Sequence, residues 1–170
     1  SSHDKTIPSL VTPNHGNNLS NTGSQPMIAI SGNSINDAQA VLDTIPLSDN
    51  QCRYWRGRLD IDGLRLVLSS GKVDIVDASL AVELAEQGKA IILPDGDFDP
   101  MTAAVDILDM KDTKYDADTG KMCSAACGCP AGQFMRGYIH HLFVVREMLG
   151  PAALVAHNLK SLQRFISAFK

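Results

Sequence analysis

Short apolar runs alternate with helix-like segments through the first half of the chain, and this order constrains the possible folds. The apolar runs are candidate buried strands, at 27–31, 52–57, 72–78 and 89–93. Segments with apolar residues at helical spacing separate them, at 35–45, 60–71 and 81–88. Parallel strands covered on both faces are typically continuous apolar runs, and βαβ units join them by right-handed crossovers. The order therefore predicts an α/β fold built on a parallel sheet.

The end of the chain has a different pattern. Apolar residues recur at three- and four-residue spacing over 132–149 and again over 152–169, which is typical of amphipathic helices. Gly150 and Pro151 lie between these segments, and proline is expected to interrupt a helix. We therefore expect two antiparallel helices joined at Gly150 and Pro151.

Composition indicates an ordinary globular protein. The 170 residues suffice for a domain with its own core, and 44% of them are hydrophobic. The formal net charge is −4, so any contact with RNA has to be local. No run of 18 apolar residues occurs, and the first residues lack the pattern of a secretory signal. We therefore expect an intracellular protein whose four cysteines are reduced thiols or metal ligands.

Two segments have the composition of irregular structure. Residues 1–25 are rich in Ser, Asn, Thr, Gly and Pro, and residues 95–118 hold eight aspartates. These aspartates do not follow the alternate spacing, turn glycine and closing glutamate of a calcium loop. We expect a solvated linker at 95–122 that contains one edge strand, at 105–110.

Three of the cysteines, Cys123, Cys127 and Cys129, lie within seven residues of one another. Cys127 and Cys129 precede one predicted helix, and His157 lies near the middle of the other, so an antiparallel helix pair can bring these three side chains together. Zinc takes thiolate and imidazole ligands and closes structural sites with four, which would make Cys123 the fourth ligand. The alternative is free thiols beside a hydrogen-bonded core histidine, and the spacing alone leaves both open.

The segment from Cys127 onward resembles the zinc-binding subdomain of the tRNA-guanine transglycosylases. That family's pattern is Cys-x-Cys-x-x-Cys, then Arg-x-Tyr-Ile/Leu-His-His-Leu, a Glu-Ile/Met-Leu-Gly turn and a His-Asn pair. The positions that match the part after the cysteines are Arg136, Tyr138, Ile139, His140, His141, Leu142, Glu147, Leu149, Gly150, His157 and Asn158. The resemblance implies Zn²⁺ as a cofactor, held by Cys127, Cys129 and His157. The family's third cysteine would fall at Gly132, so the site is either rebuilt with Cys123 or in decay.

The resemblance extends upstream to about residue 26. Residues 26–93 resemble the last third of the family's (β/α)₈ barrel, with Asp74 and Asp77 on the aspartates of its Gly-Val-Asp-x-Phe-Asp motif. Asp77 falls at the position of the family nucleophile. The implied fold is α/β: the C-terminal part of a (β/α)₈ TIM-type barrel, followed by a helical zinc-binding subdomain. The implied segments are irregular (1–25), partial barrel-like (26–94), acidic linker (95–122) and zinc subdomain (123–170).

Several positions depart from the catalytic members of that family. Ala81-Val82-Glu83 stands in place of Pro-Thr-Arg after the nucleophile, and Ile28-Ala29-Ile30 in place of the Gly-Gly-Leu turn at the base pocket. The family's second aspartate has no counterpart in the sequence, although base exchange needs one carboxylate to attack and another to move a proton. These losses resemble the accessory, non-catalytic subunits of eukaryotic queuine tRNA-ribosyltransferases. For Asp77 we therefore favour a structural role.

The resemblance to accessory subunits implies partners and a location. It implies a heterodimer with a catalytic transglycosylase subunit, with a homodimer as the variant, and contact with tRNA through a complex that makes queuosine at the wobble position. It also implies a cytoplasmic protein without a membrane-spanning segment, associated in one variant with the outer surface of mitochondria. Two alternatives remain open: an active transglycosylase with Asp77 as nucleophile, and a zinc-binding interaction module.

Overall fold

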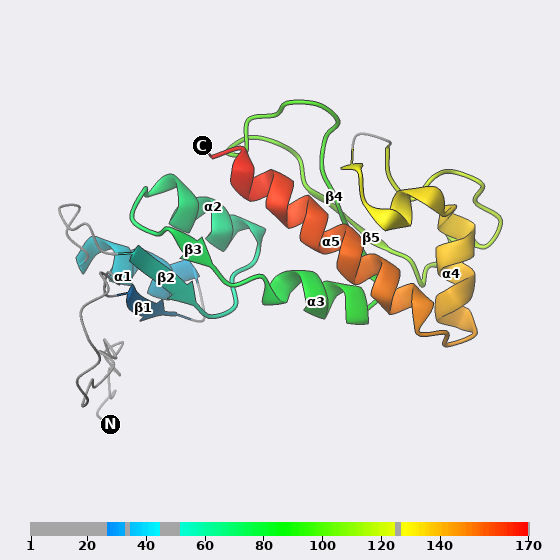
Figure 1. The fold of residues 1–170 in the computed structure, drawn as a ribbon, viewed down its shortest axis with the longest axis horizontal. Helices are drawn as coiled ribbons and strands as arrows, with labels where there is room; N and C mark the ends of the chain where they lie inside the picture. The colour runs from blue at the N-terminus through cyan, green and yellow to red at the C-terminus, as the bar shows by residue number, and fades with distance from the viewer. Residues whose placement is uncertain (1–26, 33–34, 45–51, 125–126, 170) are drawn as a thin grey trace, which may run out of the picture. The chain divides into compact units, whose positions relative to one another are not determined.

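The computed structural model describes residues 27–32, 35–44, 52–124 and 127–169 (Figure 1). The predicted irregular segment 1–25 lies outside these residues. The chain divides into two compact units, Ser1–Asp77 and Ala78–Lys170, and each is described by itself. The segment boundaries inferred from the sequence remain predictions. Among the described residues, no helix combines the length and the apolar content needed to cross a bilayer.

The first unit is built on a three-stranded parallel sheet in the order β1-β2-β3. The strands are β1 (Met27–Ser31), β2 (Cys52–Arg56) and β3 (Ile75–Val76). Met27 pairs with Cys52, and Tyr54 pairs with Ile75, both in parallel register. The predicted βαβ order is confirmed for these strands. The described strands do not close into a barrel, so the barrel remains a prediction.

The helices of the first unit are α1 (Ile35–Thr44) and α2 (Ile61–Ser69), and they pack against each other. α2 begins where the Asp60 side chain accepts a hydrogen bond from Gly63 N at 2.8 Å, because a carboxylate can satisfy a free amide of the first turn. The buried apolar residues of the unit include Ile30, Ala38, Leu42, Trp55, Leu64 and Val67. Each helix thus turns part of its apolar face into the core, through Ala38 and Leu42 in α1 and through Leu64 and Val67 in α2.

The second unit contains a two-stranded sheet and the C-terminal helices. Its elements are α3 (Ser79–Glu86), β4 (Lys89–Ile92), β5 (Asp106–Asp109), the 3-10 helices η1 (Thr113–Tyr115) and η3 (Pro130–Gln133), α4 (Arg136–Val144) and α5 (Leu149–Ser167). β4 and β5 are antiparallel, with Lys89 opposite Asp109. The predicted edge strand is present, but the prediction that 89–93 continues the parallel sheet is wrong. A short apolar run indicates that both faces of a strand are buried. It does not indicate whether the neighbouring strand is parallel or antiparallel.

Helix α5 is the centre of the second unit, where it contacts α3, β4, η3 and α4 (Figure 1). Asn158, which is fully buried, binds three backbone groups at once. Its Oδ1 accepts a hydrogen bond from Ile91 N at 2.9 Å. Its Nδ2 donates to the carbonyls of Lys89 and Ala81 at 2.9 and 3.1 Å. Buried backbone groups need partners, so this one side chain joins α3 and β4 to α5.

The junction between the C-terminal helices differs from the prediction. α4 ends at Val144 and α5 begins at Leu149, so Gly150 and Pro151 lie in the first turn of α5. Proline is tolerated there because the first amides of a helix have no partner within the helix. The connection instead contains Arg146, whose φ of 58° lies in the left-handed region. The proline therefore marks a helix start and not the break itself.

The start of α4 packs closely against the loop before it, and this contact requires a glycine. A Cβ at Gly137 would lie 2.8 Å from the carbonyl oxygen of Asp118 and 3.0 Å from that of Tyr115. Alanine in a helix is normally about 0.5–1 kcal/mol more stable than glycine. Here we expect Gly137→Ala to lower the free energy of unfolding by about 1–3 kcal/mol, because the obstacles are backbone atoms.

Chemical denaturation measures this effect. His141→Ala changes an exposed residue of the same helix and should alter the free energy of unfolding by no more than about 0.5 kcal/mol. A Gly137→Ala protein more stable than the wild type would contradict the close contact.

Candidate metal centre

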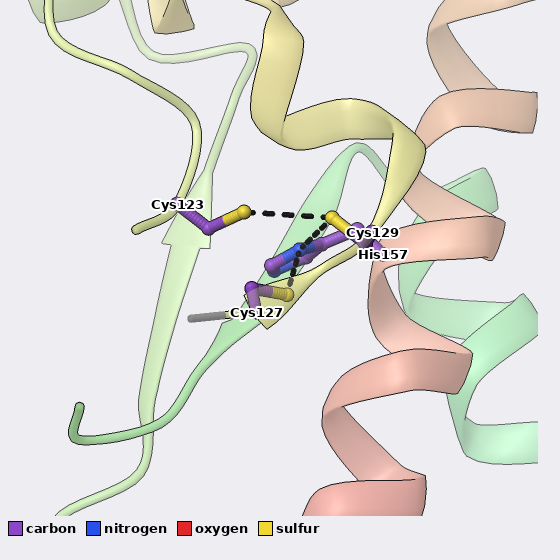
Figure 2. A group of neighbouring side chains, drawn as sticks. All are labelled: Cys123, Cys127, Cys129 and His157. Atoms are coloured by element: carbon purple, nitrogen blue, oxygen red, sulfur yellow. Dashed lines mark hydrogen bonds between the residues drawn. The ribbon is translucent and has the colours of Figure 1, made fainter. Parts of the chain in front are cut away.

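Three cysteines and one histidine meet in the second unit (Figure 2). Cys123, Cys127 and Cys129 come from the segment before α4, and His157 comes from α5. One atom of each side chain, Sγ or an imidazole nitrogen, lies within 4.8 Å of the other three. The structure therefore brings together the four side chains that were predicted as metal ligands, and the group could hold a metal ion.

The distances suit an ion bound tetrahedrally by sulfur and nitrogen. Cys129 Sγ lies 3.4 Å from Cys123 Sγ and 3.3 Å from His157 Nδ1, and Cys127 Sγ lies 3.7 Å from the same nitrogen. Zn–S bonds of about 2.3 Å and Zn–N bonds of about 2.0 Å place tetrahedral ligand atoms about 3.5–3.8 Å apart. The donor set is thus one that zinc takes, and these three separations come within about 0.4 Å of the tetrahedral values. Four protein ligands leave no open position for a substrate, so a site of this kind is structural.

Hydrogen bonding determines which nitrogen of His157 faces the thiols. Nε2 lies 2.9 Å from the carbonyl oxygen of Ile91, which can only accept, so Nε2 carries the proton. Nδ1 is then unprotonated and presents its lone pair toward Cys127 and Cys129. The same Ile91 oxygen also accepts a hydrogen bond from Ser161 Oγ at 3.0 Å. Metal-bound histidines typically donate their other N–H to a carbonyl or carboxylate in this way.

Burial favours the neutral forms of three of these side chains. Removal from water raises the pKa of the Cys123 and Cys127 thiols, and a hydrogen bond with Cys129 raises both further. Burial also lowers the pKa of His157, an effect that the hydrogen bond to Ile91 partly offsets. A neutral imidazole is the form that binds a metal, whereas a thiol has to lose its proton. A divalent cation would supply the charge that buried thiolates need.

The turn between Cys127 and Cys129 depends on a glycine. Gly128 has a φ of 62°, a conformation that other residues rarely adopt. Cys129 occupies the N-cap position of η3. The first residue of η3 is Pro130, whose ring presets the backbone angle φ. Both thiols are buried, and both lie beside the imidazole ring of His157 (Figure 2). A stretch of three residues therefore supplies two of the four candidate ligands.

Asp77, the predicted nucleophile position, lies in the first unit. Its Oδ2 accepts a hydrogen bond from the Tyr54 hydroxyl at 3.4 Å, and the residue is half-buried. Asp74 Oδ2 accepts a hydrogen bond from Arg53 N at 2.7 Å. Both carboxylates thus bind β2 from the two ends of β3.

The Arg-Gly-Tyr-Ile-His run at the start of α4 makes structural contacts. Arg136 Nε donates to Asp118 Oδ2 at 2.8 Å. A hydrogen bond from Gly120 N and the Arg136 side chain both lower the pKa of the Asp118 carboxyl. His140 is buried, and its Nδ1 donates to the carbonyl of Met110 at 2.8 Å. These contacts join α4 to the segment between β5 and the cysteines.

Sequence reasoning did not identify two of the groups around His157, namely the Ser161 hydroxyl and the Ile91 carbonyl. Ser161 follows His157 by four residues, and helical positions four apart share a face, so this spacing could have indicated the serine. Ile91 is 66 residues from His157 in the chain. Nothing local in the sequence indicates a contact of that range.

Comparison with known proteins agrees with these patterns. A family model described as queuine tRNA-ribosyltransferase matches residues 16–170. The queuine tRNA-ribosyltransferase accessory subunit 2 of Caenorhabditis briggsae is 29% identical over 126 residues, which cover 74% of this chain and 33% of that protein. The protein of the same name from Caenorhabditis elegans is 31% identical over 115 residues, 67% of this chain and 30% of that protein. A queuine tRNA-ribosyltransferase from Sphingopyxis alaskensis is 32% identical over 149 residues, 84% of this chain and 36% of that protein. The chain thus spans about a third of the length of these curated relatives.

Proposed function

The chain belongs to the queuine tRNA-ribosyltransferase family, and on that premise we propose that it acts as a non-catalytic accessory subunit. Two of the relatives described above are accessory subunits by name. The proposal rests chiefly on the segment 81–83. In the catalytic members of the family, the resemblance implies an arginine there that reads tRNA, whereas this chain has Glu83. This segment lies within α3, with Ala81 buried and its carbonyl bound by Asn158, and it ends in the acidic Glu83. A carboxylate on an anchored helix is unsuited to contact phosphate.

The contacts of Asp77 further support a non-catalytic role. Asp77 accepts a hydrogen bond from Tyr54 and thereby helps to hold β2 beside β3. Family membership also argues against the alternative of an unrelated zinc-binding module.

We assign zinc to the cluster of Cys123, Cys127, Cys129 and His157. Bound Zn²⁺ would neutralise the thiolates and connect their segment to α5. A closed four-ligand site supports folding of the second unit and not the chemistry of base exchange. In the same proposal, the parallel sheet of the first unit is part of a (β/α)₈ barrel.

The proposed partner is a catalytic transglycosylase subunit, in a heterodimer, with a homodimer as the variant. The complex would act in queuosine modification at the wobble position of tRNA in the cytoplasm, and this chain would contact tRNA only as part of it. The support is the accessory role that the names of the two nematode relatives state. Nothing in the described residues supports an association with mitochondria.

Exchange of labelled guanine into tRNA tests this function. We expect no turnover by the purified protein alone, and turnover when it is co-purified with a catalytic subunit. Light scattering should show that the two chains form a one-to-one complex. Turnover by the chain alone, lost in Asp77→Asn and kept in the control Asp74→Asn, would contradict the proposal. That result would instead identify an active enzyme with Asp77 as nucleophile.

A further inference from the structure

The fourth ligand of the proposed zinc site comes from a separate stretch of the chain, and the inference drawn from it rests on the zinc assignment. Cys123 follows a short antiparallel contact in which Lys121 bridges Met135 and Met122 N donates to Phe134 O at 3.0 Å. The Met122 side chain is 1% exposed, which anchors this contact in the core. The backbone before Cys123 thus holds its thiol beside the segment that contains η3.

Gly132, within η3, faces the thiol of Cys123. A Cβ at Gly132 would lie 3.2 Å from Cys123 Sγ, which is tighter than an ordinary contact. The φ of Gly132 lies outside the left-handed range, so the backbone there does not require glycine. Because Gly132 has no side chain, the space beside its Cα is open to the sulfur of Cys123. That sulfur lies 3.4 Å from Cys129 Sγ.

We propose that positions 123 and 132 are alternative sources of the fourth sulfur, and that Cys123 supplies it in this chain because residue 132 has no side chain. A cysteine at 132 would carry its sulfur one bond beyond a Cβ that already borders Cys123 Sγ. The two sulfurs would therefore compete for one coordination position on the zinc ion.

The two versions of the site have the same composition. In each, Zn²⁺ binds three thiols and one neutral imidazole, three S–H bonds break, and three protons leave to solvent. The ligand set is Cys₃His and the net charge of the bound group is the same. A difference in affinity between the versions therefore reports the position of the sulfur and not its chemistry.

Zinc content and affinity, measured by chelator competition on the whole chain, test the proposal. Cys123→Ala should weaken zinc binding at least about 100-fold, because loss of even an indirect partner of a metal ligand costs 10–100-fold. The double variant Cys123→Ala with Gly132→Cys should return to within about 10-fold of the wild type. Cys52→Ala, which removes the thiol in β2 of the first unit, is the control and should change nothing.

Absorption of the Co²⁺-loaded proteins gives a second readout, because thiolate-to-cobalt charge transfer grows with the number of thiolates. We expect three thiolates in the wild type, two in Cys123→Ala and three in the double variant. Wild-type affinity in Cys123→Ala would overturn the role of Cys123 and leave the zinc assignment intact. A double variant with the wild-type circular dichroism spectrum and low affinity would overturn the exchange of positions. If Cys123→Ala does not fold, Cys123→Ser replaces it with the same expected loss. A wild-type protein that binds no zinc would overturn the metal centre itself.

Discussion

Replacement of His157 by alanine should abolish stoichiometric zinc binding and lower the midpoint of thermal unfolding by at least about 10 °C. The side chain is 1% exposed and has two roles in the second unit. Its Nδ1 faces the thiols of Cys127 and Cys129, and its Nε2 donates to Ile91 O. Structural zinc contributes about 10–16 kcal/mol of binding free energy in small domains. A loss of only about 3 kcal/mol already corresponds to this shift in a unit of this size.

Calorimetry with and without a zinc chelator separates the metal from the packing of the imidazole. The chelator should lower the midpoint of the wild type and leave that of His157→Ala unchanged, because only the wild type has a metal to lose. His141→Ala removes an exposed histidine of α4 and should respond as the wild type does. A wild-type midpoint that ignores the chelator would identify His157 as a core histidine beside free thiols.

Local periodicity predicted the parts of the fold that local sequence determines. The three parallel strands follow from short apolar runs in the sequence. The same reasoning failed at β4, because an apolar run does not reveal the direction of its neighbour. It also failed at Pro151, since proline is compatible with the first turn of a helix as well as with a break.

The candidate site could likewise be predicted from the sequence only in part. Cys127, Cys129 and His157 could be proposed together because a turn before one helix can approach a second helix packed against it. The fourth position stayed open because the place of Cys123 depends on the bridge between Lys121 and Met135. The groups that support His157 come from β4, far away in the chain. The spacing in the sequence thus indicated the candidate ligands. The groups that hold these ligands in place come from tertiary contacts, which the spacing does not reveal.

Asn158 should matter greatly to stability, although it binds no metal. Asn158→Leu keeps an apolar side chain of similar size but leaves Ile91 N and the carbonyls of Lys89 and Ala81 without their partner. An unsatisfied buried group costs about 1–3 kcal/mol. We therefore expect the free energy of unfolding to fall by about 3 kcal/mol or more, measured by chemical denaturation. Leu159→Ala changes the exposed neighbour and should cost no more than about 0.5 kcal/mol.

Hydrogen exchange at the Ile91 amide tests this role of Asn158. Ile91 lies opposite Ile107 of β5, yet its N–H and C=O bind side chains of α5, so the helix satisfies the outer edge of β4 as a third strand would. In Asn158→Leu the amide should exchange quickly. In Asn158→Asp, which is nearly isosteric, one oxygen still accepts from Ile91 N while the other opposes two carbonyls, so the protein should be destabilised with this amide still protected. Equal protection of the Ile91 amide in the wild type and in Asn158→Leu would mean that α5 does not serve as the missing strand.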